Sequence, residues 1–398
     1  MSIALEKEGS TIGAILLITG CCIGAGMIGL PVLSAKAGFI PSTLAMFLCY
    51  LFATSTGLLL LEATLWFDQK VNLLTMANFA LGKAGKAVTW FLFLFLFYCL
   101  FVAYIDGGGQ LFAGMFSTFF NYHVPREIGI LCCVAVVCAI VYCGTKVVST
   151  ISRVFLFGLA FSYCALLSLG LPHIAPERLL DANWTAGIKT IPILLICFGY
   201  QNLIPTLTYY VKKNVRSLRI AIYVGNLIPF VIYLLWNFVI LGLLPDAHSI
   251  AFSKILSQTN MVTGLLQKAS ASESVHFFAK TFSLFAILTP FMANTLSFVD
   301  FLKDGLKVTK ESKYEILIYA LVLVPPTIFT FFYPHLFLKA LGFAGGFADV
   351  ILFGILPVFI VWFGRYIRKI EGPFTVLGGK PFLIVILLFS IGVLLIRN

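Results

Sequence analysis

Carboxyl groups inside long apolar segments are the residues of this chain with the clearest capacity for chemistry. Asp106 and Asp349 fall inside such segments, and Glu62 falls near the end of one. Charge within a bilayer is costly, so an ionisable residue there is a functional candidate by default. We expect proton coupling at Asp106 first, then at Asp349, with Glu62 as the third candidate, because a buried acid whose surroundings change can take up and release a proton. In the alternative interpretation, Asp106 forms a neutral structural bridge with Lys280, and Glu62 is solvated or pairs with lysines near its end of the segment.

Glycines interrupt the first apolar segment. The stretch 18–31 reads Ile-Thr-Gly-Cys-Cys-Ile-Gly-Ala-Gly-Met-Ile-Gly-Leu-Pro and holds four glycines, which are unfavourable in a helix interior. A bilayer tolerates unwound backbone only where it is buried in protein or lines a cavity. A second interruption, Phe-Gly-Tyr-Gln-Asn-Leu-Ile-Pro at 198–205, lies in another apolar segment near mid-chain. Paired broken segments in the two halves of a chain indicate the binding site of a secondary transporter.

The two breaks predict a site for a zwitterion. Backbone N–H groups at Gly24, Ala25 and Gly26 begin the second half of the first segment, where the positive end of the helix dipole suits a carboxylate. Carbonyl groups that end the preceding half-helices, near 18–21 (with Gly20 and Cys21 as binding candidates) and near 197–199, suit an ammonium group. An amino acid would thus be bound without a charged side chain. The alternative is close helix packing, which is common for small residues in membranes and which we favour for Gly13 and Gly57.

Side chains near the breaks could hold an aromatic ring. The aromatic candidates can stack with a ring, and the amides can accept a phenol or indole proton; single aromatics are otherwise ordinary core residues. The substrate-contact candidates from the second break and the third segment are Tyr104, Phe198, Gly199, Tyr200, Gln201 and Asn202.

Composition identifies a membrane protein. Of the 398 residues 60% are hydrophobic and 11% charged, and the mean hydropathy is +1.02, whereas soluble domains have about 25% charged residues. The net charge of +11 lies in short loops and follows the positive-inside rule, so no nucleic-acid partner is implied. The sequence has no phosphate-binding loop, zinc motif or recognisable nucleophile–base spacing. We therefore expect no enzyme activity, no cofactor and no metal site.

Hydropathy predicts an all-α polytopic membrane protein with eleven transmembrane helices. Dense Lys and Arg clusters such as 212–219 and 365–369 place the N-terminus in the cytoplasm, and an odd number of spans then places the C-terminus outside. The region 245–273 is expected to be an external loop with at most a short helix. The predicted spans are 11–37, 40–66, 87–119, 127–145, 153–172, 186–211, 218–244, 274–300, 315–334, 337–366 and 380–397.

Breaks in the first and sixth spans divide the chain into two sets of five spans and one extra span. Because five is odd, the second set enters the membrane in the opposite orientation, which is the inverted-repeat arrangement of many transporters. We predict one transporter domain over 1–398, with repeat one at about 11–172, repeat two at about 186–366 and the extra helix at about 380–397.

Two motifs resemble those of the hydroxy and aromatic amino acid permeases, within the amino acid-polyamine-organocation superfamily. They are Gly-Ala-Gly-Met-Ile-Gly-Leu-Pro at 24–31 and Phe-Gly-Tyr-Gln-Asn-Leu-Ile-Pro-Thr-Leu at 198–207, and order and spacing match along most of the chain. The chain departs from the family pattern at Gln201-Asn202, where His-Gly is expected, and at Asp106, where a small neutral residue is expected. Similarity to the bacterial tyrosine and tryptophan permeases implies proton symport of tyrosine, tryptophan or both across the inner membrane, with the C-terminus in the periplasm.

Three alternatives stay open at this level. The first is a serine or threonine permease of the same fold. The second is sodium coupling, for which the eighth span offers Thr289, Asn294, Thr295 and Ser297 as ligands. The third is a membrane sensor that binds an amino acid without concentrating it, which uphill accumulation would exclude.

Overall fold

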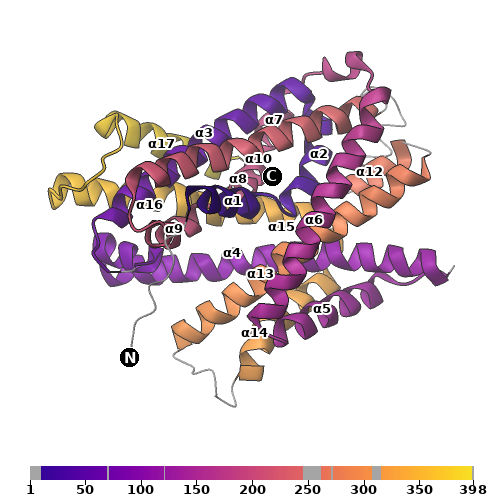
Figure 1. Cartoon of the computed structure of the whole chain (residues 1–398), viewed down its shortest axis with the longest axis horizontal. Helices are drawn as coiled ribbons and strands as arrows, with labels where there is room; N and C mark the ends of the chain where they lie inside the picture. Colours follow the sequence, from indigo (N-terminus) through magenta and orange to yellow (C-terminus); the bar gives the residue numbers. More distant parts are fainter. Residues whose placement is uncertain are drawn as a thin grey trace.

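The computed structural model describes residues 10–69, 71–120, 122–244, 261–269, 272–306 and 315–396, and all regular structure in these ranges is helical (Figure 1). The membrane-length and shorter helices are α1 (Thr11–Cys22), α2 (Gly26–Ala37), α3 (Phe39–Leu65), α4 (Leu73–Phe120), α5 (Arg126–Tyr142), α6 (Thr145–Gly170), α7 (Trp184–Ile188), α8 (Ile191–Cys197), α9 (Ile204–Tyr210), α10 (Val215–Leu243), α12 (Val262–Ala269), α13 (Glu273–Leu306), α14 (Glu315–Phe332), α15 (Phe337–Phe343), α16 (Leu356–Trp362) and α17 (Gly379–Leu394). The 3-10 turns are η1 (Leu171–His173), η2 (Pro176–Leu179) and η3 (Gln201–Leu203), and the π-helical stretches are η4 (Ala344–Ile355) and η5 (Phe363–Ile367).

Each of the eleven predicted spans corresponds to helical structure. Seven helical segments are long and apolar enough to cross a membrane, and an eighth is the pair α1 and α2, which is bent by 57° at a short break. The remaining predicted spans correspond to α5, α14 and α17, which are shorter. The protein is an all-α polytopic membrane protein, as predicted. The short helix expected in the loop after the seventh span is α12; residues 245–260 of that loop lie outside the described ranges.

Two spans differ from the simple prediction. The helix of the third span begins at Leu73, well before the predicted start at 87, and turns sharply at Gly82, whose φ of 66° strongly favours glycine. The tenth span is not one regular α-helix, because its middle twelve residues form the π-helix η4. Wide turns of this kind are often found at functional sites.

The spans form two groups that pack against each other. The broken spans α1–α2 and α7–α9 pack with α3 and α10, and we call this group the bundle. The long helix α4, which crosses the middle of Figure 1, packs with α5, α13 and α14, and we call this group the scaffold. The tenth span, from α15 to η5, contacts both groups. The repeat boundaries expected from the sequence stay a prediction.

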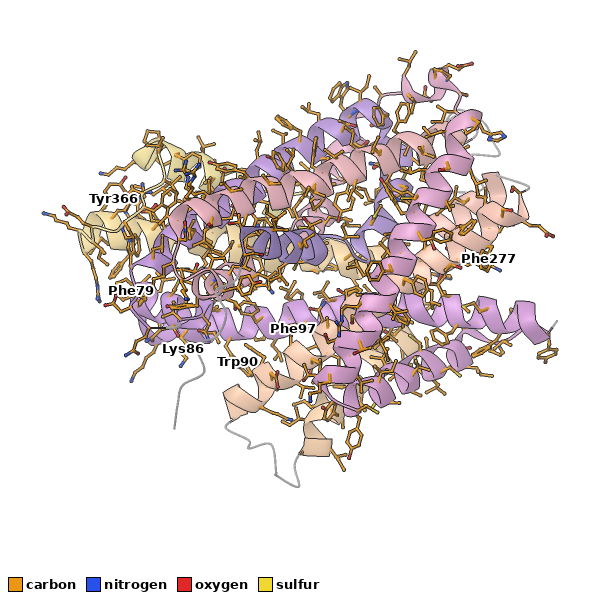
Figure 2. The ribbon with its side chains drawn as sticks, in the orientation of Figure 1. Phe79, Lys86, Trp90, Phe97, Phe277 and Tyr366 are labelled. Atoms are coloured by element: carbon orange, nitrogen blue, oxygen red, sulfur yellow. The ribbon has the colours of Figure 1, made fainter. Side chains whose placement is uncertain are left out.

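Aromatic side chains hold the scaffold helices together. Phe97 of α4 stacks on Phe298 of α13, with ring centroids 4.7 Å apart. Trp90, two turns earlier, stacks on Phe301 at 5.7 Å, and Figure 2 shows Trp90 and Phe97 on the same stretch of α4 beside α13. Stacked pairs of this kind add about 0.5–1.5 kcal/mol beyond area burial. They fix α13, which faces the breaks across the interior.

The two ends of the molecule are named here by the first span. The Thr11 end holds the start of α1 together with the ends of α3 and α9, and Tyr209 of α9 bonds there to the backbone of Gln69. The Ala37 end holds the end of α2 and the starts of α3 and α7. Which end faces the cytoplasm stays a prediction from the positive-inside rule.

Candidate functional site

The first break leaves backbone groups free at the positions predicted to bind a zwitterion. In the described part of the chain, the N–H groups of Gly24, Ala25 and Gly26 have no hydrogen-bond partner, although Gly24 and Ala25 are buried. The carbonyl groups of Gly20 and Cys21 likewise accept no backbone bond from α2. Buried main-chain groups are nearly always paired in proteins. This cluster of free donors beside free acceptors therefore points to a ligand.

The two breaks touch each other. α8 ends at Cys197 and α9 begins at Ile204, with only one 3-10 turn between them. The Cys21 thiol donates to the carbonyl of Gly199 at 3.6 Å, and a Cβ at Gly26 would collide with the sulfur of Cys197. Glycine at 26 therefore allows a close approach of α2 to α8, which brings both breaks into one site.

A tyrosine of α10 joins the two half-helices. The hydroxyl of Tyr233 donates to the carbonyl of Cys22 at 2.5 Å and also lies 3.3 Å from the carbonyl of Cys197. Cys22 and Cys197 are the last residues of α1 and α8. Their carbonyls are thus occupied by the Tyr233 hydroxyl and are not available to a substrate. The carbonyls of Gly20 and Cys21 remain for an ammonium group. Sequence reasoning missed Tyr233, because nothing in its local pattern shows that it lies opposite both breaks.

Further contacts of α10 brace the first span on both sides of the break. Thr19 Oγ1 donates to the carbonyl of Gly225 at 3.1 Å. On the other side, Trp236 Nε1 donates to the carbonyl of Met27 at 3.0 Å. These bonds compensate for the helix bonds that the break removes, so the unwound backbone is held in a defined geometry.

Two predicted aromatic contacts point into the bundle. Tyr200 is fully buried, and its hydroxyl donates to the carbonyl of Ala53 in α3 at 3.0 Å. Gly57, expected to serve packing, makes room for this ring, since a Cβ there would collide with the Tyr200 hydroxyl. Phe198 is also fully buried and meets Tyr233 edge to face at 5.6 Å. Both rings support the shape of the second break.

The two predicted amides differ in position. Gln201 is 2% exposed; its Nε2 donates to Thr56 Oγ1 at 3.2 Å, and its Oε1 is buried without a partner among the described residues. Asn202 is exposed and lines a cavity of about 440 Å³. Thr206 and Ser297 line the same cavity, from α9 and α13. The rest of its lining is mainly apolar, and the cavity reaches the second break from the Thr11 end.

Tyr104 lies across from the first break, on α4. It is 4% exposed, packs on Phe291 with centroids 5.7 Å apart, and accepts a hydrogen bond from Asn294 Nδ2 at 3.0 Å. Phe291 and Asn294 belong to α13. Pro290 of α13 lies 3.5 Å from where a Cβ of Gly24 would be. α13 thus forms the wall opposite the break, and Asn294 is the polar side chain of that wall.

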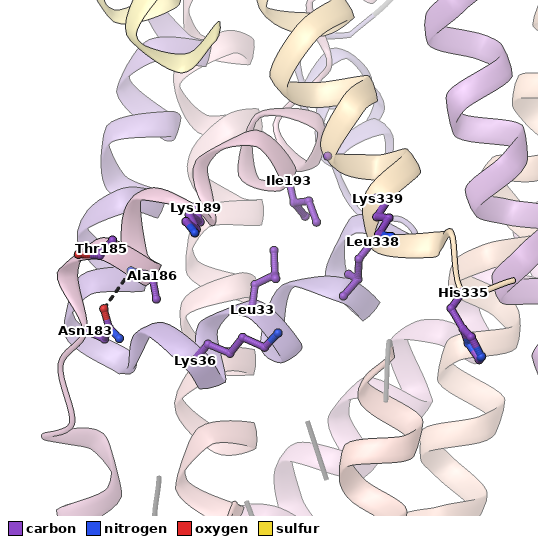
Figure 3. A pocket seen from close by; sticks show the side chains of 11 residues that line it. Leu33, Lys36, Asn183, Thr185, Ala186, Lys189, Ile193, His335, Leu338 and Lys339 are labelled. Carbon is purple, nitrogen blue, oxygen red and sulfur yellow. Dashed lines mark hydrogen bonds between the residues drawn. The ribbon is translucent and has the colours of Figure 1, made fainter. Parts of the chain in front are cut away.

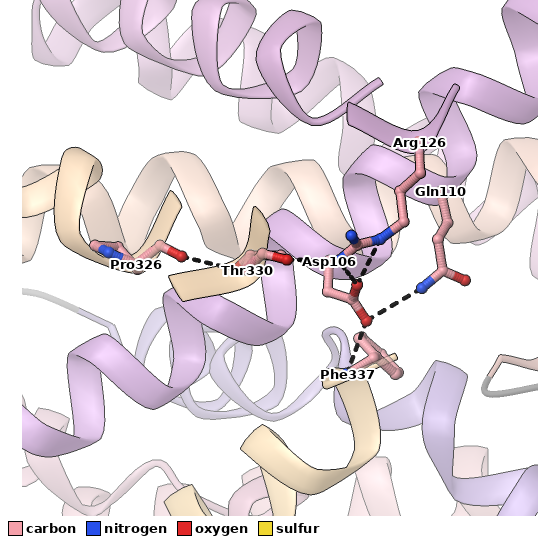
Figure 4. A network of polar contacts seen from close by, with 6 residues as sticks. All are labelled: Asp106, Gln110, Arg126, Pro326, Thr330 and Phe337. Carbon is pink, nitrogen blue, oxygen red and sulfur yellow. Dashed lines mark hydrogen bonds and ion pairs between the residues drawn. The ribbon is translucent and has the colours of Figure 1, made fainter. Parts of the chain in front are cut away.

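Asp106 sits at the centre of a polar network (Figure 4). Its Oδ1 accepts from Arg126 Nε at 3.2 Å and from Arg126 Nη2 at 2.6 Å. Its Oδ2 accepts from Gln110 Nε2 at 3.1 Å and from the backbone N–H of Phe337 at 2.9 Å. Arg126 also donates to the carbonyl of Thr330 at 2.9 Å. The network ties α4 to α5, α14 and α15.

The ion-pair partner of Asp106 is Arg126 at the start of α5, and not Lys280 as the alternative interpretation supposed. Both carboxylate oxygens have donors, and the carboxylate is fully buried. Removing one partner of such a buried pair costs about 3–5 kcal/mol. The geometry therefore supports a structural role for Asp106, as in the alternative interpretation, more than the role of a proton carrier.

Asp349 has the opposite environment. It is 2% exposed, and its Oδ1 is buried without a hydrogen-bond partner among the described residues. It lies on η4, and a Cβ at Gly199 would be 3.2 Å from Oδ1, so the carboxyl group faces the second break. Gly345 allows this approach, because a Cβ there would collide with the carbonyl of Pro192 in α8. The wide turn of η4 thus places an unpaired acid beside the zwitterion site.

Glu62 is paired at the Thr11 end. It is 1% exposed, accepts from both Nε and Nη2 of Arg365, and accepts from the backbone N–H of Val376 at 2.8 Å. Arg365 Nη2 also donates to the carbonyl of Val376 at 2.9 Å. This unit joins α3 to η5 and to the segment before α17. Glu62 is thus paired, as one alternative supposed, but with an arginine and not with a lysine.

Comparison with known proteins identifies the family of the chain. The model of the tryptophan/tyrosine permease family matches residues 7–397. A tyrosine-specific transport system of Haemophilus influenzae is 31% identical over 96% of this chain and 94% of its own length. A tryptophan-specific transport protein of Pseudomonas aeruginosa is 28% identical over 97% and 94%, and a glutamine transporter of Aliivibrio fischeri is 29% identical over 84% of each chain. The chain, with its paired breaks and nearly full-length match, belongs to the tryptophan/tyrosine permease family.

Proposed function

We propose that the protein imports tyrosine, tryptophan or both across the bacterial inner membrane by proton symport, as a transporter and not as an enzyme. The observation that carries this proposal is the pair of touching breaks, with free N–H groups at 24–26 and free carbonyls at 20–21. Such a site recognises the backbone of an amino acid. The names of the tyrosine- and tryptophan-specific relatives support an aromatic side chain.

The substrate carboxylate binds the N–H groups of Gly24, Ala25 and Gly26, because they begin α2 and carry the positive end of its dipole. The substrate ammonium binds the carbonyls of Gly20 and Cys21. These positions leave the substrate ring facing α13 and α4. The backbone part of the site selects amino acids as a class, and the facing wall selects among them.

The aromatic ring lies against Phe291 and Tyr104 of that wall. Asn294, partly exposed and already oriented by Tyr104, offers an amide to a phenol or an indole N–H. Asn202 and the cavity at the Thr11 end form the path away from the site. The second break is held on its α3 and α10 side by Phe198, Tyr200 and Gln201. These side chains do not need to contact the substrate.

Asp349 carries the coupled proton. An ionised carboxylate there would be buried without a compensating donor, so this conformation favours the neutral acid. The acid takes up its proton in the outward-facing state and carries it inward while it stays buried and neutral. When the broken spans of the bundle move further from the tenth span at the Thr11 end, water reaches Asp349 and the proton is released into the cytoplasm. Asp106 keeps its partners and holds the scaffold to the start of the tenth span. Glu62 keeps its pair with Arg365, which joins α3 of the bundle to the end of the tenth span.

With the Thr11 end in the cytoplasm and the C-terminus outside, the structure is the cytoplasm-facing state. The cavity that reaches Asn202 opens at the Thr11 end. Towards the Ala37 end, α2 is pressed against α15, since a Cβ at Gly29 would lie 2.7 Å from Leu338 and 3.3 Å from Phe337. Asp106 fixes the start of α15 through the N–H of Phe337. The outer path is closed at this contact.

A glutamine transporter is the second candidate, favoured by the relative of that name. Uptake of labelled tyrosine into proteoliposomes, with a proton gradient, a sodium gradient or neither, separates these functions. Tryptophan, glutamine and serine are added as unlabelled competitors. We expect concentrative, proton-driven uptake blocked by tryptophan. Sodium dependence, competition by glutamine or serine alone, or binding without accumulation would refute the coupling, the substrate class or the transport function, respectively.

A further inference from the structure

A second cavity, of about 610 Å³, lies at the Ala37 end, away from both breaks (Figure 3). Three lysines from three separate elements line it: Lys36 of α2, Lys189 just after α7, and Lys339 of α15. His335 lies at its side. None of the lining residues is acidic, and within the described residues these four side chains have no ion-pair or hydrogen-bond partner.

The floor of this cavity is apolar. Figure 3 shows Leu33, Ile193 and Leu338 between the three lysines. Ammonium groups that line one hollow without an acidic neighbour favour an anion, because its charge offsets their mutual repulsion. The volume is within the range of about 300–1,000 Å³ that holds small organic ligands, so a bare inorganic anion would leave the apolar floor in contact with water.

We propose that this cavity binds a small organic carboxylate with an apolar body, such as an aromatic acid that lacks an ammonium group. The carboxylate meets the lysines, and the ring covers the apolar floor. A zwitterionic amino acid is disfavoured, because its own ammonium group would face three others. The cavity is therefore distinct from the substrate site in position and in the charge that it selects.

Its walls belong to both moving parts of the molecule. Lys36 and Lys189 lie on the bundle, whereas Lys339 lies on the tenth span, and α2 and α8 contact α15 in this state. An anion shared by these lysines stabilises the contact that closes the Ala37 end. Such a carboxylate inhibits transport without competing with the substrate. The inhibition rests on the proposed transport function, whereas the binding does not.

Binding is tested first, on purified full-length protein in detergent at low ionic strength, with radiolabelled phenylacetate. We expect saturable binding that excess tyrosine does not displace and that weakens at high salt. The variant Lys36→Gln, Lys189→Gln, Lys339→Gln should lose at least tenfold in affinity. The matched control is Lys83→Gln, Lys86→Gln, Lys369→Gln, which removes three exposed charges elsewhere, and it should bind as the parent does. Thermal unfolding of both variants shows whether they are folded.

The comparison ligands are 2-phenylethylamine, benzyl alcohol and inorganic phosphate. The proposal fails if the triple variant binds phenylacetate within twofold of the parent, or if tyrosine displaces it. It also fails if the amine or the alcohol binds equally well, or if phosphate displaces phenylacetate at equal concentration, because the apolar body would then be irrelevant. Uptake inhibition is measured second, in proteoliposomes with phenylacetate applied from the Ala37 side. Loss of inhibition with binding intact would refute the conformational effect alone, and absence of uptake in the parent would refute the transport function but not the site.

Discussion

Replacing Asp349 by asparagine should abolish proton-driven accumulation of the substrate while the exchange of substrate across the membrane continues. The side chain is buried, its Oδ1 has no partner among the described residues, and it faces the second break at Gly199. Asparagine has nearly the same size and is neutral, as the protonated acid is. We therefore expect the variant to fold and to bind substrate, with a stability change within about 1 kcal/mol. It has no proton to release when the surroundings of residue 349 change.

The size of the effect follows from one coupling acid that carries one proton. Moving one charge through a membrane potential of 100 mV supplies about 2.3 kcal/mol. Because about 1.4 kcal/mol corresponds to a factor of ten, one proton supports roughly 50-fold accumulation of a neutral amino acid. In Asp349→Asn this accumulation should fall to about the external concentration.

The assay uses proteoliposomes with an imposed membrane potential of known size. Net accumulation of labelled tyrosine is measured first, and exchange of external label for internal unlabelled tyrosine is measured in the absence of a gradient. We expect lost accumulation and retained exchange. The matched control is Asp106→Asn, which removes an acid from the same membrane region but should leave coupling intact in the protein that remains folded. If Asp349→Asn still concentrates tyrosine to more than half of the parent level, the assignment of Asp349 is refuted.

Four further predictions concern the site and its supports. Gly26→Ala should abolish uptake without preventing insertion, because its Cβ collides with the sulfur across the break; Gly392→Ala, whose Cβ meets no atom within 4 Å, is the control, and normal affinity in the first variant would refute the close approach. Tyr233→Phe should cost about 1–3 kcal/mol of stability by leaving break carbonyls unpaired and should lower substrate affinity; unchanged thermal unfolding and affinity would show that the hydroxyl is dispensable. Cys21 is exposed, so a membrane-impermeant thiol reagent should block uptake from the Thr11 side only, and tyrosine should protect; modification that ignores tyrosine would place the residue outside the substrate path. Asp106→Asn should lower stability by about 3–5 kcal/mol, measured by denaturation, and a variant as stable as the parent would contradict the structural role.

The class of the protein and the course of its spans could be predicted from the sequence. Hydrophobic length alone marks membrane helices, because every backbone polar group in lipid must be bonded within its own segment. Glycine at 24 and 26 signals the first break for the same reason, since the unfavourable residue is in the sequence itself. The π-helix η4 has no comparable signal, because its width depends on how closely Gly345 and its neighbours approach α8.

The roles of individual side chains depended on the tertiary structure. Sequence ranked Asp106 above Asp349, but the structure gives Asp106 donors from Arg126, Gln110 and Phe337, whereas no described residue donates to Oδ1 of Asp349. Tyr200 looked like a ring for stacking on substrate, and the fold turns it towards α3. These outcomes differ because helix formation and membrane insertion are decided within a segment, whereas the partner of a buried polar group comes from a segment far away in the chain. Sequence alone therefore determined that this is a transporter-like membrane protein with two breaks, and only the tertiary structure decided which acid stays unpaired beside them.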